Sequence, residues 1–215
     1  MPAHVALLGD SIFDNRSYVG NGPDVVTQLR DALPNGWKAS LLAVDGSVIG
    51  DLPQQLAQLE ADVSEVAVSL GGNDVLGEID LLGARVGTAT EALLKLGEAV
   101  AWFERSYRGA VASLRDTGRS ITLCTIYNGN LPDMGPGFPD PHAARMALTA
   151  FNDVILRVAF ELGLDVIDLR LVCNEAADYA NPIEPSSRGG EKIARAIVRA
   201  LGLTQTPARR TQVFY

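Results

Sequence analysis

The chain has 215 residues, of which 47% are apolar and 20% are charged, and its formal net charge at neutral pH is −8. These values are typical of an ordinary globular protein that can bury a core without disulfides or metals. The acidic balance argues against nucleic acid or an anionic membrane as partner, because both are bound through surplus Lys and Arg. No apolar segment approaches the ~20 residues that are needed to cross a bilayer.

The amino terminus and the cysteines indicate a cellular compartment. The first residues lack the basic and apolar regions of a signal peptide. The two cysteines, Cys124 and Cys173, are far apart in apolar surroundings, so we expect buried thiols rather than a disulfide. These features predict a cytoplasmic protein. The oligomeric state stays open, a homo-oligomer included.

Short apolar runs alternate with longer stretches of helical spacing. The expected strands are 5–8, 41–44, 66–70, 121–126 and 164–169. The expected helices carry apolar faces within 25–33, 93–114, 146–162 and 193–201. This alternation predicts βαβ units with a parallel sheet, and right-handed crossovers favour a doubly wound, three-layer α/β/α sandwich.

Two segments do not fit the alternation. Residues 128–141 are rich in Pro and Gly and follow the fourth expected strand, so we expect a long loop over the carboxyl edge of the sheet. Residues 204–215 form a tail that is either disordered or docked on a neighbouring subunit. We therefore expect a single domain over 1–203 followed by this tail.

Polar clusters follow the first three expected strands. They are Gly9-Asp10-Ser11, the segment 45–51 with Gly50 near its end, and Gly71-Gly72-Asn73-Asp74. Since the carboxyl ends of parallel strands share one edge, Ser11, Gly50 and Asn73 should converge. A hydroxyl that attacks, with N–H donors for the oxyanion, is the layout that acyl transfer needs. Each cluster alone is equally typical of a turn or a helix cap.

The three clusters, in this order and spacing, resemble three of the four sequence blocks of the SGNH (GDSL-type) hydrolases. The resemblance implies a flavodoxin-like, five-stranded parallel sheet in the order 2-1-3-4-5. It also implies hydrolysis of small acyl or acetyl esters through an acyl-enzyme on Ser11, without cofactor or metal. The oxyanion hole would consist of the Ser11 N–H, Gly50 and Asn73.

The fourth block departs from the family pattern. The family has Asp, two residues and then His, whereas this chain has Asn181 and Glu184. Glutamate accepts a proton less readily, since its reference pKa is ~4.3 against ~6.5 for His, unless burial raises it. We take Glu184 as the first-choice base. The alternative is a structural carboxylate that caps the last helix or binds an Arg.

Histidine offers a rival base. His142 ends the Pro/Gly-rich loop at the expected active edge, whereas His4 opens the first strand at the opposite edge. An exposed position at a helix start is the plain alternative for His142. A Mg²⁺ site at Asp10, Asp14 and Asp74 is disfavoured, because Asp10 and Asp74 belong to the hydrolase pattern. A second hypothesis for the whole chain is a weakened or inactive relative that binds an acylated ligand or a partner protein through the same pocket.

Overall fold

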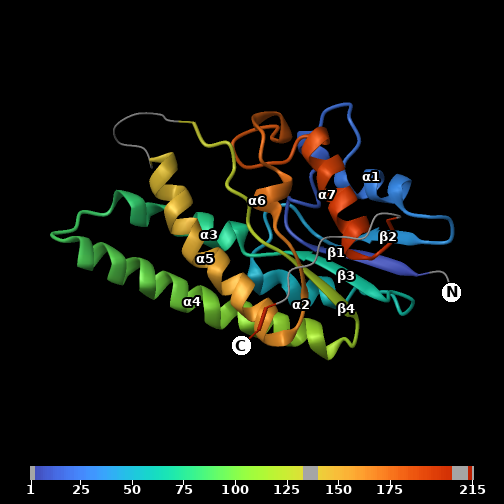
Figure 1. Cartoon of the computed structure of the whole chain (residues 1–215), viewed down its shortest axis with the longest axis horizontal. Helices are drawn as coiled ribbons and strands as arrows, with labels where there is room; N and C mark the ends of the chain where they lie inside the picture. The colour runs from blue at the N-terminus through green and yellow to red at the C-terminus, as the bar shows by residue number, and fades with distance from the viewer. Residues whose placement is uncertain (1–2, 133–139, 205–212, 215) are drawn as a thin grey trace.

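The computed structural model describes residues 3–132, 140–204 and 213–214. Its core is a five-stranded parallel sheet in the order β2-β1-β3-β4-β5 (Figure 1). The strands are β1 (His4–Gly9), β2 (Lys38–Leu41), β3 (Glu65–Ser69), β4 (Ser120–Cys124) and β5 (Asp165–Ile167). The sheet order that the family resemblance implied is confirmed.

Helices cover both faces of the sheet. They are α1 (Val25–Ala32), α2 (Leu52–Leu56), α3 (Gly72–Gly77), α4 (Ala89–Asp116), α5 (Pro141–Leu162), α6 (Leu169–Val172) and α7 (Ser187–Ala200), with 3-10 turns η1 (Arg16–Tyr18), η2 (Ile49–Asp51), η3 (Ile79–Gly83) and η4 (Ala176–Asp178). Side chains of α2, α4 and α5 pack in one core cluster, and those of α1, α6 and α7 pack in the other. In β1, Ala6 and Leu8 belong to the first cluster and Val5 and Leu7 to the second, as expected for a strand that is buried on both faces.

The ends of the predicted helices match local capping chemistry. The Asp24 carboxylate accepts the Thr27 N–H at the start of α1, and the Ser186 hydroxyl accepts the Gly189 N–H at the start of α7. Gly163 ends α5 with φ of 65°, a left-handed conformation that glycine adopts without cost. All four expected helical segments are therefore confirmed.

The second strand lies earlier in the chain than we predicted. Residues 41–44 were expected, but the strand ends at Leu41. The N–H groups of Leu42 and Ala43 both donate to the Leu7 carbonyl at 2.8 Å, so the regular ladder stops there. The fifth predicted strand also ran too far, since α6 begins at Leu169. Apolar content alone did not reveal these breaks in the hydrogen-bond register.

Other expectations have mixed outcomes. Cys124 and Cys173 are free and buried, as predicted. Residues 128–132 have neither helix nor strand, which fits the expected loop, while 133–139 and most of the expected tail lie outside the described residues. Within the described ranges, no helix combines the length and the apolar content that crossing a membrane requires.

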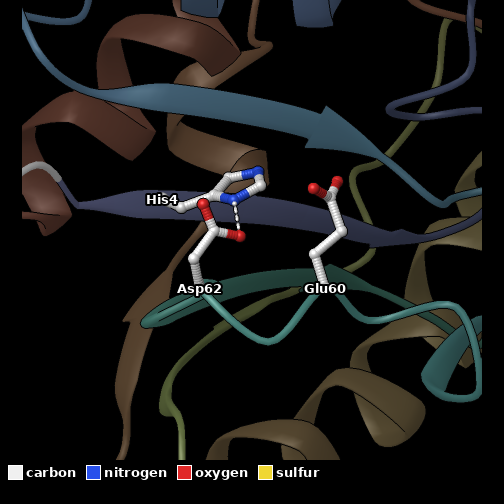
Figure 2. A group of neighbouring side chains, drawn as sticks. All are labelled: His4, Glu60 and Asp62. Carbon is white, nitrogen blue, oxygen red and sulfur yellow. Dashed lines mark hydrogen bonds and ion pairs between the residues drawn. The ribbon is translucent and has the colours of Figure 1, made fainter.

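A charged cluster joins β1, β2 and the segment before β3 at the edge of the sheet where β1 begins. The His4 Nδ1 lies 3.0 Å from Asp62 Oδ1, and its Nε2 lies 2.7 Å from the Ser40 hydroxyl. That hydroxyl donates to Glu60 at 2.9 Å, and Lys38 donates to Asp62 at 3.0 Å. Figure 2 shows the His4 ring facing both carboxylates, which come from the segment before β3. The cluster thus links β1 and β2 to that segment, at the edge where we placed His4.

Substitution of Gly9, at the end of β1, tests how closely the backbone is packed just before Ser11. Gly9 has φ of +123°, and an added Cβ would lie 1.6 Å from the Ser69 carbonyl oxygen. We expect Gly9→Ala to lower the free energy of unfolding by more than about 3 kcal/mol, because backbone must move as well as adopt a strained φ. Gly36→Ala is the control, since Gly36 has φ of +90° with no atom within 4 Å of the added Cβ. Urea unfolding should show a loss of only about 1–2 kcal/mol there, and an equal loss in both variants would contradict this account.

Candidate active site

Ser11 lies in a tight turn at the carboxyl end of β1. The Asp10 N–H donates to the Ser69 carbonyl at 3.2 Å, so the chain stays next to β3 as it leaves the strand. The N–H groups of Phe13 and Asp14 then both donate to the Asp10 carbonyl at 3.1 Å. Ser11 is 6% exposed. The turn therefore holds the hydroxyl at the sheet edge where ligands bind in open α/β folds.

A buried glutamine supports this turn from below. Gln55, on α2, accepts the Gly9 N–H at 2.7 Å and donates to the Gly9 carbonyl at 2.8 Å. It also donates to the Ser47 hydroxyl at 3.3 Å. Gln55 is 2% exposed, so these partners replace its hydration. The sequence does not indicate this role for Gln55, because a glutamine in a helix normally faces solvent.

Glu184 reaches the same edge from the segment before α7. The Asn181 side-chain oxygen accepts the N–H groups of Ile183 and Glu184, each at 2.9 Å, and so fixes the backbone that carries the carboxylate. Burial raises the pKa of Glu184, the hydrogen bond from the Ser11 hydroxyl lowers it, and the charge of Asp45 raises it further. The net pKa lies above the ordinary glutamate value. Ser11 and Glu184 thus form a hydroxyl–carboxylate pair.

Asn15, which the sequence did not single out, connects the segment after Ser11 to the segment that carries Glu184. Asn15 is completely buried, and its amide nitrogen donates to the Pro185 carbonyl at 3.1 Å. Its side-chain oxygen accepts the Val25 N–H at 2.9 Å, at the start of α1. Pro185 is the neighbour of Glu184, so Asn15 holds the segment after Ser11 against the segment of the candidate base. The sequence carried no signal for this contact, which spans 170 positions.

The expected oxyanion donors lie in two adjacent segments. Asn73, in the first turn of α3, donates from its amide nitrogen to the Ser47 carbonyl at 2.8 Å and lines a cavity together with Ser11 and Glu184. Gly50 lies in η2, is exposed, and is absent from the described lining of that cavity. The Ile49 N–H donates to the Asp74 carboxylate at 3.0 Å, which ties η2 to α3. Of the sequence-derived residues, Ser11, Asn73 and Glu184 are therefore brought together in one cavity, whereas Gly50 lines a separate cavity together with Ile49 and Asp74.

The rival base lies away from this group. His142 is exposed in the first turn of α5, where its N–H donates to the Asp140 carboxylate at 2.7 Å. Its neighbours Ala143 and Ala144 line the cavity, whereas His142 is not part of the described lining. Its placement matches the plain alternative of an exposed residue at a helix start.

Two aspartates of the disfavoured Mg²⁺ site, Asp14 and Asp74, accept backbone hydrogen bonds. Asp14 accepts the Asp45 N–H at 3.0 Å, and Asp74 accepts the Ile49 N–H at 3.0 Å. Among the described residues, the group whose ligand atoms lie close enough to share a metal ion is the His4 cluster at the opposite edge. There the His4 nitrogens and both acids already contact one another, Ser40 or Lys38.

Asp10 is a second buried acid beside the pair. It is 3% exposed, and its side chain accepts the Ile12 N–H at 3.1 Å and the Ser69 hydroxyl at 3.3 Å. Burial raises the pKa of Asp10 to about 7, opposed by these hydrogen bonds and aided by the charge of Glu184. At pH below this value Asp10 is neutral, so it does not repel the negative charge on Glu184. Asp10 and Glu184 are therefore two buried acids at the site whose pKa values both lie above their ordinary values.

Comparisons with known proteins agree with the fold. The model of the GDSL-like lipase/acylhydrolase family matches residues 7–191. Among solved structures, an extracellular lipase from Streptomyces rimosus has a TM-score of 0.66 at 16% identity, covering 92% of this chain and 99% of that one. An acetylxylan esterase from Geobacillus stearothermophilus has a TM-score of 0.64 at 22% identity, covering 96% of this chain and 97% of that one. No curated protein sequence matches the chain.

The buried acid at the site makes stability depend on pH. The folded chain keeps the Asp10 proton up to about pH 7, whereas the unfolded chain releases it near 3.8, so stability falls as pH rises between these values. Asp10→Asn keeps an oxygen acceptor and removes this loss. We expect the variant to melt at a higher temperature than wild type at pH 7–8, and the difference to vanish near pH 4. Thermal melts across this range check it, and a difference that grows toward low pH would contradict the assignment.

Proposed function

The chain belongs to the GDSL-like lipase/acylhydrolase family, and we propose that it is an ester hydrolase that forms an acyl-enzyme on Ser11 with Glu184 as its general base. The observation that carries this proposal is that Ser11 and the buried Glu184 carboxylate line the same cavity, with the hydroxyl close enough to lower the pKa of the carboxylate. A hydroxyl becomes a nucleophile at neutral pH when an adjacent base takes its proton. The substrate class is a small-molecule acyl ester.

The reaction proceeds in two steps, acylation of Ser11 and hydrolysis of the acyl-enzyme. In the first, Glu184 takes the Ser11 proton while Oγ attacks the ester carbonyl carbon, and the tetrahedral intermediate then expels the alcohol, which receives the proton from Glu184. In the second, Glu184 takes a proton from water, and the hydroxide attacks the acyl-enzyme. Collapse of that intermediate releases the carboxylic acid and returns the proton to Ser11.

The oxyanion of each intermediate is bound by N–H donors. We assign the Ser11 N–H, the Gly50 N–H and the Asn73 amide to this role, as in the family pattern. In support, the Ser11 N–H makes no hydrogen bond within the described residues, and Asn73 spends only one of its two amide hydrogens on Ser47. Gly50 is in the first turn of η2, where N–H groups have no partner within the helix.

An exposed glutamate is a weaker base than histidine, so Glu184 needs a raised pKa to do the work of the family's histidine. Burial of Glu184 supplies that, because it raises the pKa and so increases the pull on the Ser11 proton. The neighbouring Asn181 is neutral, whereas the family has Asp at this position. A carboxylate base needs no second acid to balance an imidazolium charge, so the two changes in the fourth block are chemically consistent with each other.

A pair of variants separates the two candidate bases. We expect Glu184→Gln to lower kcat on a chromogenic acyl ester by about 10²–10⁴-fold, because the amide has nearly the same shape but does not take the proton. His142→Ala should retain activity within two-fold. Circular dichroism and urea unfolding of both variants serve as controls for folding. Full activity of Glu184→Gln with loss in His142→Ala would overturn the assignment. Equal, base-independent activity in all three proteins would instead support the weakened, ligand-binding relative.

The pH dependence of the reaction provides a second test. Glu184 works only when ionised, so kcat/KM should fall as pH decreases through its pKa, and burial places this limb above the ordinary glutamate value. The limb should be unchanged in His142→Ala. Restoring the family residues with Asn181→Asp and Glu184→His together should move it toward the imidazole range near ~6.5. A wild-type limb that disappears in His142→Ala would identify the histidine as the base.

A further inference from the structure

The cavity at Ser11 extends far beyond the reacting groups. Its volume is about 530 Å³, and it reaches from Ser11 and Glu184 to residues of α3, η3, α4 and α5. Helices α4 and α5 are in contact near mid-length, where the Phe103 and Phe151 rings meet edge to face at 5.4 Å. Toward their amino-terminal ends they spread apart (Figure 1). The space beside the site is therefore walled by helices.

The walls of this extension are apolar. They include Val75, Leu76, Leu82, Leu96, Leu148 and Phe151. Leu76, Leu82 and Leu148 are half-buried and take part in neither core cluster, so part of their apolar surface is left facing the cavity. Besides Asp10 and Glu184, the charged side chains of the lining are Glu78 and Lys95. Displacement of water from such a surface by a hydrocarbon is favourable, because apolar area on both sides is removed from water.

The rim of the cavity is apolar too. Leu93 on α4 is 68% exposed and Met146 on α5 is 71% exposed, and both line the cavity. Exposed apolar side chains that continue into an apolar cavity mark a binding surface rather than scattered surface residues.

From this shape and lining we infer that the acyl part of the substrate is a flexible hydrocarbon chain of about eight or more carbons, held between α3 and α5. The inference rests on the proposed function and names the substrate class of the same site. An acetyl group would leave nearly all of the 530 Å³ unfilled. Each methylene that is fully buried strengthens binding roughly four-fold, so the cavity selects for length until it is full. The half-buried Ala147, on the cavity wall of α5, sets part of the available length.

A series of p-nitrophenyl esters from acetyl to hexadecanoyl tests this. We expect kcat/KM to rise by about 2–4-fold per methylene from acetyl to octanoyl and then to level off. Ala147→Trp should lower kcat/KM at least ten-fold for the decanoyl ester and leave the acetyl ester within two-fold. Thr149→Trp is the matched control, because Thr149 is exposed on the same helix and outside the cavity lining, so it should change neither. A maximum at acetyl, or equal effects of both substitutions, would overturn the inference.

A binding measurement separates this inference from the proposed function. Ser11→Ala cannot form an acyl-enzyme, so binding of 11-(dansylamino)undecanoic acid to it reports on the cavity alone. Saturable fluorescence enhancement that is lost when Ala147→Trp is added supports the chain site, even if wild type hydrolyses no ester and the proposed function fails. Hydrolysis of acetyl esters by wild type without saturable probe binding to Ser11→Ala overturns the chain site and leaves the proposed function standing.

Discussion

A carboxylate that is buried beside a hydroxyl loses much of its hydration, so its pKa rises and its oxygens depend on the few donors nearby. Glu184 is in this position, at 6% exposure, with the Ser11 hydroxyl beside it lowering its pKa and with its Oε2 left without a partner among the described residues. Such a group has a raised pKa and so binds a proton more readily than an exposed carboxylate does. Burial of the Glu184 carboxylate makes the free energy of folding less favourable, and the surrounding contacts offset this loss.

Those contacts bring together segments that are far apart in the chain. Asn15 bonds the Pro185 carbonyl, Asn181 fixes the turn that carries Glu184, and Gln55 holds the Gly9 backbone ahead of Ser11. Each is a polar side chain whose bonds go to backbone groups, and so it fixes main-chain geometry. The backbone therefore sets the relative position of the hydroxyl and the carboxylate. The parallel sheet and the turn at Gly9 hold that backbone in place.

The fold and part of the site were predictable because they depend on local patterns. Apolar runs between helical stretches predicted the sheet and its helices, and polar residues at strand ends predicted Ser11 and Asn73 at one edge. Gln55 and Asn15 were not predictable, since their partners lie 46 and 170 positions away and a lone amide has no pattern. The apolar cavity was hidden for a related reason. Its lining residues have the spacing of an ordinary core face, and only the spread of α4 from α5 leaves them unfilled.

The central claim is that Glu184 activates Ser11, and the rate of serine phosphonylation measures that directly. Intact-mass and peptide mass spectrometry after reaction with a fluorophosphonate should find one adduct, on Ser11. The rate constant in Glu184→Gln should fall by at least a hundred-fold relative to wild type, while His142→Ala reacts at the wild-type rate. An unchanged rate in Glu184→Gln, or an adduct elsewhere with Ser11 unmodified, would contradict the account.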